Sequence, residues 1–448
     1  MKKFFETLAN IWKIEELKNK ILITLGLLLV YRFGTQVTLP GIDATKLQAL
    51  TEQTDQGIGW LINVFTGGAF AQASVFALGI MPYISASIVV QLMGIAVPYL
   101  QKLQNDGESG RKKMNQITRW LTIGITLLQG PSYIYNLYVQ LPSDAFLLGF
   151  NSFSFLFSSV IILVTGTIFA MWLGEKITDK GIGNGISLLI MVGIIARLPM
   201  SFIQEFQSRI TDNNGGPMLV VIEVILWLLI IVACIYLTLA VRRIPVQYAR
   251  RSASGTYDQS MLGGNRQWIP LKLNASGVMP IIFAQAIMFV PAAVAGLSTS
   301  DTAKSISSTF HDVFGWQYNL LFALLIIIFT YFYTAITVPT NKMADDLKRS
   351  GGFIPGVRPG SETADFLDRI MSLITFPGSL YLALIAVFPA IVVSLLGVQQ
   401  GWAMFYGGTS LLIMVSVVID TIQQVNAYLL NKQYDSMMTS GKNRRAIA

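Results

Sequence analysis

The sequence predicts an all-α protein that crosses a membrane ten times, and three observations lead to this fold class. Charged residues make up 12% of the 448 residues and hydrophobic residues 53%, whereas a soluble domain carries about 25% charged residues. Apolar stretches of about 20 residues, long enough to cross the hydrocarbon layer as helices, recur along the chain. Lysine and arginine gather in alternate connections between these stretches, as is typical of cytoplasmic loops.

Ten stretches have the length and hydropathy of a spanning helix, which satisfies its own backbone polar groups. They are residues 21–39, 76–98, 118–139, 153–173, 183–203, 217–240, 276–297, 317–338, 371–396 and 402–423. Before the first of them, Phe4, Phe5 and Trp12 lie among lysines and acids, which predicts an amphipathic helix on the membrane surface. No small-residue cleavage site follows 21–39, so we expect the first span to stay in place.

The positions of the basic residues predict an orientation. With the N-terminus inside, 27 of the 32 Lys and Arg lie in the two tails and in the inner loops. Lys46, Arg197, Arg209 and Lys304 fall on the other side, and Arg32 lies within the first span. One span more or fewer would move several basic loops to the opposite side of the membrane. The uneven division of basic residues therefore supports the number of spans and predicts that both termini are cytoplasmic.

The residues of the spans argue against an enzyme and against a metal or other cofactor. Cys234 and His311 are the single Cys and the single His, which excludes a disulfide framework and a Cys/His metal cluster. No nucleophile and base can be paired. Among ionisable residues in lipid, which are functional candidates by default, only Arg32, Glu223 and Asp420 approach the spans. Each lies near a span end, where its side chain can reach the interface, so we expect structural roles.

Residues 61–74 (LINVFTGGAFAQAS) form an irregular segment before the second span. The segment is too short to cross the membrane and is rich in Gly, Ala and Ser. Gly79 and Pro82 then interrupt the start of the next helix. Two interpretations stay open, a half-helix that dips into surrounding protein or an interfacial helix in an outer loop, because irregular backbone at membrane depth needs protein or water around it.

Two inner loops, 241–275 and 339–370, are long, basic and rich in Gly and Pro. Such loops are commonly topology signals or contacts with anionic lipid headgroups. Two of them on one face also suit a large acidic or RNA-containing partner. GIGNGIS at 181–187 is only superficially similar to a phosphate loop, because it does not follow a strand.

Seven motifs, in the same order along nearly the whole chain, resemble the SecY family, which forms the central subunit of the bacterial Sec protein-conducting channel. They are PGID (40–43), FTGGAFAQASVFALGIMPYISASIVVQL (65–92), GESGRKK (107–113), TGTIFAMWLGEKITDKGIGNGIS (165–187), IPLKLN (269–274), GFIPGVRPG (352–360) and YGGTSLLI (406–413). The stretches 252–268 and 300–316 depart from the family pattern.

The resemblance implies two inverted halves, 1–203 and 204–448, around an hourglass pore in the bacterial inner membrane. The second half would include both long loops and a cytoplasmic tail, 424–448. Segment 61–74 would be a short plug helix, with the plug residues Asn63, Phe65, Gly67, Gly68, Ala69 and Ser74. A constriction of six apolar side chains maps onto the isoleucines Ile80, Ile84, Ile186, Ile190, Ile282 and Ile413.

The family also implies a lateral exit and a docking platform. The polar cluster of the lateral gate, between spans two and three and spans seven and eight, maps onto Ser85, Gln129 and Asn274. Docking of the ribosome and the SecA motor ATPase maps onto Arg242, Arg243, Arg250, Arg251 and Arg358. The implied partners are the small subunits SecE and SecG, SecA, the ribosome, unfolded preproteins with signal sequences, anionic lipids, YidC and SecDF.

Two other functional classes compete with a passive channel that a partner powers. A secondary transporter for a small solute also commonly has about ten spans in inverted repeats. The scarcity of ionisable groups near the midplane and the two basic loops disfavour it. An intramembrane enzyme lacks a catalytic set.

Overall fold

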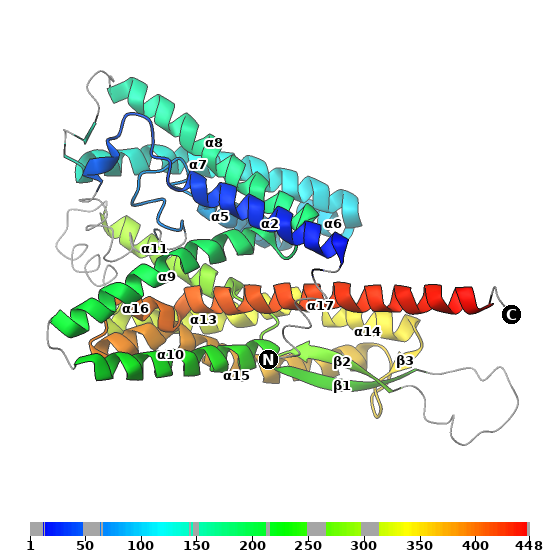
Figure 1. Cartoon of the computed structure of the whole chain (residues 1–448). Coiled ribbons are helices and arrows are strands. Elements are labelled where there is room, and N and C mark those ends of the chain that lie inside the picture. Colours follow the sequence, from blue (N-terminus) through cyan, green and yellow to red (C-terminus); the bar gives the residue numbers. More distant parts are fainter. Residues whose placement is uncertain are drawn as a thin grey trace, which may run out of the picture. The chain divides into compact units, whose positions relative to one another are not determined.

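The structure is a computed structural model that describes residues 12, 14–47, 63, 66–142, 145–146, 152–211, 216–248, 266–296 and 313–445. Helices dominate this part of the chain (Figure 1). The chain divides into two compact units, a first unit of Met1–Gln204 with Val417–Ala448 and a second unit of Glu205–Ser416. The predicted halves, 1–203 and 204–448, concern an internal symmetry that this division does not test.

The first unit contains five whole helices, the larger first part of a sixth helix and the last part of a seventh. They are α2 (Glu15–Gly34), α5 (Met81–Ala96), α6 (Pro98–Asn105), α7 (Gly107–Gln140), α8 (Ser152–Lys180), most of α9 (Gly185–Thr211) and the last part of α17 (Gly408–Arg445). Helix α7 packs on α5 and α8, and α8 also packs on α2. The chain bends by 102° between α5 and α6, because Pro98 disfavours a helical conformation at the residue before it.

The second unit contains the end of α9 and the beginning of α17. Between them lie α10 (Gly216–Leu239), α11 (Met279–Gly296), α13 (Trp316–Thr337), α14 (Thr340–Arg349), α15 (Ser361–Leu396), α16 (Gln400–Ala403) and the 3-10 turn η4 (Met404–Tyr406). Helix α13 packs along α15 and α11. The glycine after α15, Gly397, has φ +62°, the left-handed conformation that commonly ends a helix.

A helix lies on each of the ten predicted spans, namely α2, α5, α7, α8, α9, α10, α11, α13, α15 and α17. Within the described residues, six helices are long and apolar enough to cross a membrane by length and composition, or seven if the bent pair α5 and α6 forms one span. The mostly helical, membrane-spanning fold class is therefore confirmed, and the count of ten crossings stays a prediction.

The second predicted span begins later than expected, at Met81 instead of residue 76. Residues 66–80 form consecutive turns, and Gly79 has φ +53°. Pro82 lies in the first turn of α5, where its missing N–H needs no helical partner. Of the predicted plug helix, 61–74, the structure describes Asn63, which is helical, and residues 66–74, which form turns with one short bridge at Ser74.

The two long inner loops contain a small sheet that was not predicted from the sequence. Strand β1 (Val241–Tyr248) pairs antiparallel with β2 (Arg266–Lys272) and with β3 (Gly352–Phe353), in the order β2-β1-β3. The reason for the omission is Pro245, which lies within the central strand and pairs with Trp268. Proline is normally confined to edge strands and bulges, so these residues suggested a loop.

Candidate plug, pore ring and docking platform

The plug segment, defined here as residues 66–74, is folded on itself by hydrogen bonds to Asn63 and Thr66. The Asn63 carbonyl accepts from the Gly68 N–H at 2.8 Å, and the Asn63 Oδ1 accepts from the Ala71 N–H at 3.1 Å. The Thr66 hydroxyl accepts from the Phe70 N–H at 3.2 Å. Asn63 and Thr66 are fully buried. These side chains replace the hydrogen bonds that a regular helix would make.

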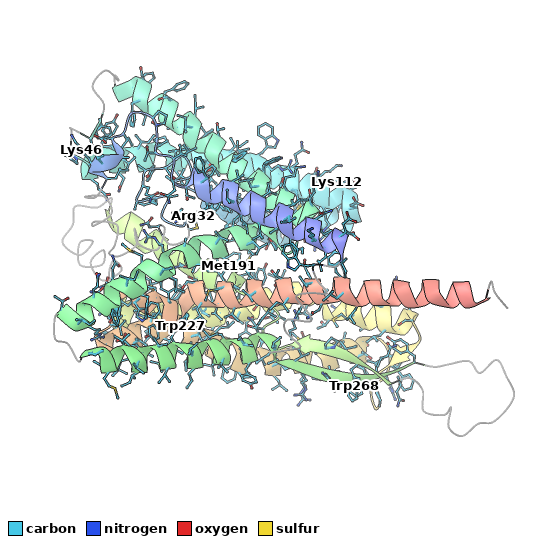
Figure 2. The ribbon with its side chains drawn as sticks, in the orientation of Figure 1. Arg32, Lys46, Lys112, Met191, Trp227 and Trp268 are labelled. Atoms are coloured by element: carbon cyan, nitrogen blue, oxygen red, sulfur yellow. The ribbon has the colours of Figure 1, made fainter. Side chains whose placement is uncertain are left out.

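Two side chains from neighbouring helices hold the plug segment in the first unit. Arg32, in the last turn of α2, donates from Nη1 to the Gly67 carbonyl at 2.6 Å. Tyr133 of α7 donates from its hydroxyl to the Phe70 carbonyl at 2.8 Å. A hydrogen bond from a charged donor is roughly twice as strong as one between neutral groups. Figure 2 labels Arg32 in the first unit.

Gly67 allows the plug segment to lie directly on α9. Its φ is +67°, and a Cβ at this position would lie 2.8 Å from the Cα of Gly193. A side chain at Gly67 would therefore strain the backbone and collide with another backbone, which is the combination that demands glycine. This close approach requires glycine at position 67.

The turn after α2 pairs with the end of the plug segment. The Leu39 N–H donates to the Ala73 carbonyl at 2.8 Å, and the Val75 N–H donates to the Val37 carbonyl at 2.9 Å. In the same turn the Asp43 carboxylate accepts from the Thr45 N–H at 3.0 Å. That backbone hydrogen bond, followed by one from the Thr45 hydroxyl, lowers the pKa of the Asp43 carboxyl. The PGID motif thus forms a fixed turn beside the plug segment.

The structure describes five of the six predicted plug residues. Asn63, Ala69 and Ser74 are buried, and Gly67 and Gly68 both have positive φ. Phe65 lies outside the described residues. Sequence reasoning expected only a structural role for Arg32 near a span end and did not connect it with the plug. A cation inside a predicted span was the available signal.

The six predicted ring isoleucines divide between the units. Ile80, Ile84, Ile186 and Ile190 lie in the first unit, and Ile282 and Ile413 lie in the second. Ile80, Ile190 and Ile413 are buried, and the other three are half-buried. The Ile186 side chain packs against Gly174 of α8. That the six isoleucine side chains meet at one level to form a ring stays a prediction.

The three predicted lateral-gate residues differ in their exposure and lie in different units. Ser85 on α5 is half-buried, and Gln129 on α7 is exposed. Helices α5 and α7 pack together, but within the described residues no hydrogen bond joins these two side chains. Asn274 follows β2 in the second unit, is half-buried and accepts from the Ser276 hydroxyl at 3.5 Å. A polar cluster of all three stays a prediction.

The sheet joins the two basic inner loops into one surface, the predicted docking platform, defined here as β1, β2, β3 and the turn 354–360. Beneath it, Ile244, Val246 and Leu271 pack with Leu347 and Ile354 in a buried cluster. The alternation of buried Ile244 and Val246 along β1 is the period of two that a strand requires. Figure 2 labels Trp268 on this sheet.

The predicted docking arginines lie on the surface of this platform where they are described. Arg242 and Arg243 on β1 are exposed. The side chain of Arg358 is 87% exposed, and its contact with Glu362 is a loose 3.6 Å. The Arg358 carbonyl accepts from the Thr363 hydroxyl at 2.8 Å, which fixes the backbone below the exposed guanidinium. Arg250 and Arg251 lie outside the described residues.

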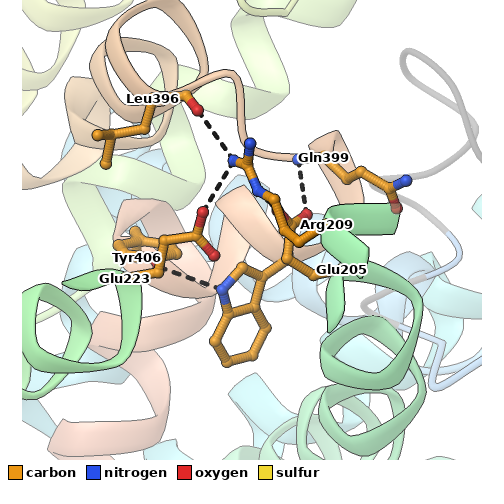
Figure 3. Close-up of polar contacts among 7 residues, drawn as sticks. Glu205, Arg209, Glu223, Leu396, Gln399 and Tyr406 are labelled. Atoms are coloured by element: carbon orange, nitrogen blue, oxygen red, sulfur yellow. Dashed lines mark hydrogen bonds and ion pairs between the residues drawn. The ribbon is translucent and has the colours of Figure 1, made fainter. Parts of the chain in front are cut away.

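Glu223 corrects an expectation from the sequence. Its side chain does not reach the protein surface but is fully buried and paired with Arg209 at 2.8 Å (Figure 3). Arg209, which was expected in an outer loop, also pairs with the buried Glu205 at 2.8 Å. The three residues form an ionic cluster within the second unit. Asp420 is exposed on α17, and within the described ranges no three His, Cys, Asp or Glu side chains are grouped to hold a metal ion.

Known proteins match the chain over nearly its full length. A protein translocase subunit SecY from Streptomyces scabiei is 37% identical over 439 residues, covering 96% of this chain and 99% of that protein. The subunit of the same description from Aquifex aeolicus is 36% identical and covers the same shares. That from Haemophilus influenzae is 39% identical over 426 residues and covers 94% of each chain.

Solved structures share the fold. A protein-conducting channel superimposes with a TM-score of 0.59 at 19% identity, covering 92% of both chains. A second structure, of a protein whose plug domain stabilises the closed state of the translocation channel and maintains a membrane seal, gives 0.60 at 17% identity over the same shares. The SecY family model matches residues 74–422. With that match and with relatives above 30% identity over nearly all of their length, the chain belongs to the SecY family.

Proposed function

We propose that the chain is the channel-forming subunit of a protein translocase, which passes unfolded secretory polypeptides across the membrane and releases apolar segments sideways into lipid. The observation that carries the proposal is the plug segment, a run of buried turns tied to α2 and α7 just before the helix that bears Ile84. The relatives at 36–39% identity are described as protein translocase subunits. A solved neighbour has a plug domain that maintains a membrane seal.

The six isoleucines suit a seal that polypeptides must pass. A ring of branched hydrocarbon offers an ion no replacement for its hydration shell, so a narrow constriction dewets and resists leakage. The same ring makes no directional bonds, so it closes around passing side chains of any kind without holding them. A ring of charged groups would bind some polypeptides and would also conduct ions.

The ring assignment predicts that Ile84→Asn with Ile190→Asn raises the ion leak of the closed channel, because the two amides would wet the constriction. The measurement is the conductance of purified channels in planar bilayers. Val89→Asn with Ile195→Asn is the matched control, since Val89 and Ile195 lie on the same two helices but are 39% and 41% exposed. Equal conductance of the ring variant and the control would remove Ile84 and Ile190 from the constriction.

A lateral exit would discriminate between apolar and polar segments. Polar contacts between membrane helices contribute about 0.6 kcal/mol each on average. Burial of a single large apolar side chain contributes about 1.5–3 kcal/mol. A signal helix with several such side chains would therefore outweigh a cluster of a few polar residues, and a polar segment would not.

Replacement of Asn274 by Leu is expected to relax the discrimination between functional and defective signal sequences. Loss of the amide would weaken the polar seam that a signal helix must open. Export of a preprotein with a shortened apolar signal core measures this discrimination, and Asn274→Gln, which keeps an amide, is the control. Unchanged stringency in Asn274→Leu would favour a static role for the residue.

The proposed partners follow from the docking platform and from the family. Exposed arginines on β1 and at Arg358 suit an acidic motor or ribosomal RNA, and a solved neighbour is Sec61 in a ribosome-channel complex, at 18% identity and a TM-score of 0.55. We therefore include the ribosome, SecA, SecE and SecG among the partners. With 27 of 32 basic residues on one side, we propose the bacterial inner membrane with both termini cytoplasmic.

The decisive experiment reconstitutes the purified chain with its small membrane subunits in lipid vesicles. With the motor ATPase and ATP, a preprotein with a signal sequence should become protected from external protease, and the same preprotein without the apolar signal core should not. Vesicles that protect neither preprotein but accumulate a small solute would instead indicate a secondary transporter.

A further inference from the structure

The ionic cluster of the second unit joins three segments of the chain (Figure 3). Arg209 near the end of α9 donates from Nε to Glu205 and from Nη2 to Glu223 of α10, both at 2.8 Å. The same Nη2 donates to the Leu396 carbonyl at 2.9 Å, at the end of α15. Glu205 in turn accepts from the Gln399 N–H at 2.8 Å. The cluster thus ties both helices to the segment that leads into α16.

A group of aromatic side chains, Trp227, Trp402 and Tyr406, adjoins this cluster at Tyr406 (Figure 3). Trp402 and Tyr406 are almost fully buried, and the Trp402 indole N–H donates to the Tyr406 hydroxyl at 3.1 Å. The Trp227 indole N–H donates to the Phe405 carbonyl at 2.8 Å. The side chains of Arg209, Glu205 and Glu223 are 5%, 1% and 0% exposed. Bulk water therefore has little access to screen their charges.

The two carboxyl groups of the cluster differ in their hydrogen bonds. Glu205 uses both oxygens, Oε1 with the Arg209 guanidinium and Oε2 with the Gln399 N–H. Glu223 uses Oε1 with Arg209, but its buried Oε2 has no hydrogen-bond partner among the described residues. Among the described residues, the Tyr406 hydroxyl on η4 is a further titratable group near the cluster, and Asp212, between α9 and α10, lies outside the described residues. Two acidic groups thus face one guanidinium.

A surplus charge in such a place is unfavourable. Burying an ionised carboxylate that lacks full compensation costs more free energy than burying a neutral carboxylic acid that lacks one hydrogen bond. A proton on Glu223 Oε2 removes the surplus charge and leaves Oε1 free to accept from Arg209. Glu205 is the poorer site for that proton, because both of its oxygens already accept hydrogen bonds.

We propose that the folded channel holds a proton on Oε2 of Glu223, which makes the cluster of Glu205, Arg209 and Glu223 electrically neutral. Glu205 is then the ionised partner of Arg209, and Glu223 is a neutral acceptor. The neutral cluster fixes the segment from Leu396 to Tyr406, directly before α17. This proton site does not depend on the proposed translocation activity, since it concerns the folded state of the second unit.

Infrared spectroscopy of the purified chain at neutral pH tests the proposal directly. The wild-type protein should show a C=O stretching band of a protonated carboxylic acid, and ¹³C-labelling of glutamate should shift that band. The band should be missing from Glu223→Gln. Absence of any label-sensitive acid band in the wild type overturns the proposal, even if no variant folds.

The stabilities of two isosteric variants provide the second measurement. Glu223→Gln should change the thermal unfolding midpoint in detergent by no more than about 2 °C, because the amide resembles the protonated acid. Glu205→Gln removes the ionised partner of a buried guanidinium, so its midpoint should fall by roughly 5–10 °C. Equal losses in the two variants, or a larger loss in Glu223→Gln, would show that Glu223 is ionised and would overturn the assignment.

Discussion

Motor-driven export is expected to fall by about tenfold or more when Arg358 is replaced by Glu, while assembly of the channel stays intact. Truncation of one partner of a buried, hydrogen-bonded charge pair in an interface costs about 2–5 kcal/mol of binding free energy, and a reversed charge adds like-charge repulsion, which is enough for such a loss. Arg358 is available for that role because its side chain is 87% exposed and its own Glu362 contact is loose. Its backbone is held by Thr363, so the change should leave the fold of the platform unaltered.

The measurement for Arg358→Glu is ATP-dependent translocation in vesicles, together with the yield of assembled complex. Arg349→Glu is the matched control, because Arg349 is an exposed arginine at the end of α14 in the same inner loop. If the Arg358 variant exports as well as this control, the turn 354–360 is not the motor contact. A loss of assembled complex in the Arg358 variant would point instead to a folding role.

Replacement of Arg32 by Gln is the second change with a large expected effect. The variant loses a charge-assisted hydrogen bond to the Gly67 carbonyl, and bonds to charged groups contribute about 1.5–3 kcal/mol. Since each 1.4 kcal/mol is a factor of ten, the displaced form of the plug segment should become about 10- to 100-fold more populated. Single-channel recordings without any partner should then show more frequent openings.

Two further variants sharpen the test of Arg32. Tyr133→Phe removes the second anchor, the bond to the Phe70 carbonyl, and should raise the opening frequency by a smaller factor because its donor is neutral. Lys20→Gln is the control, since Lys20 is a cation of the same helix that contacts Tyr428 instead of the plug segment. Opening frequencies of Arg32→Gln that match those of Lys20→Gln would contradict the anchoring role.

The helices of the fold were predictable because their signal is local. A run of about twenty apolar residues can be recognised as a spanning helix from its own sequence, without knowledge of what it contacts. Each predicted span indeed contains a helix. The start of α5 was misplaced by five residues, because an apolar run such as 76–80 looks the same in a helix and in buried turns. The sheet was missed because Pro245 contradicts a central strand, and only its pairing partners reveal it.

The contacts of charged residues could be predicted only in part. Arg32 was conspicuous inside a span, but its acceptor is a backbone carbonyl 35 positions away, which carries no side-chain signal. Glu205 and Arg209 lie beyond the predicted end of the fifth span; Arg209 was therefore expected on the outer side, and no role was predicted for Glu205. Their burial depends on Glu223 and on the Leu396 carbonyl, 187 positions from Arg209, and such tertiary contacts leave no periodic pattern in the sequence.

The shortness of the links around the sheet has a mechanical consequence. One residue separates α10 from β1, and six separate β2 from α11, with the Leu273 N–H bonded to the Ala240 carbonyl at 2.9 Å. The one-residue link between α10 and β1 cannot absorb a displacement of several ångströms, because one residue spans at most about 3.6 Å. A displacement of these strands is therefore transmitted to α10 through the single linking residue, and to the segment before α11 through the Leu273–Ala240 hydrogen bond.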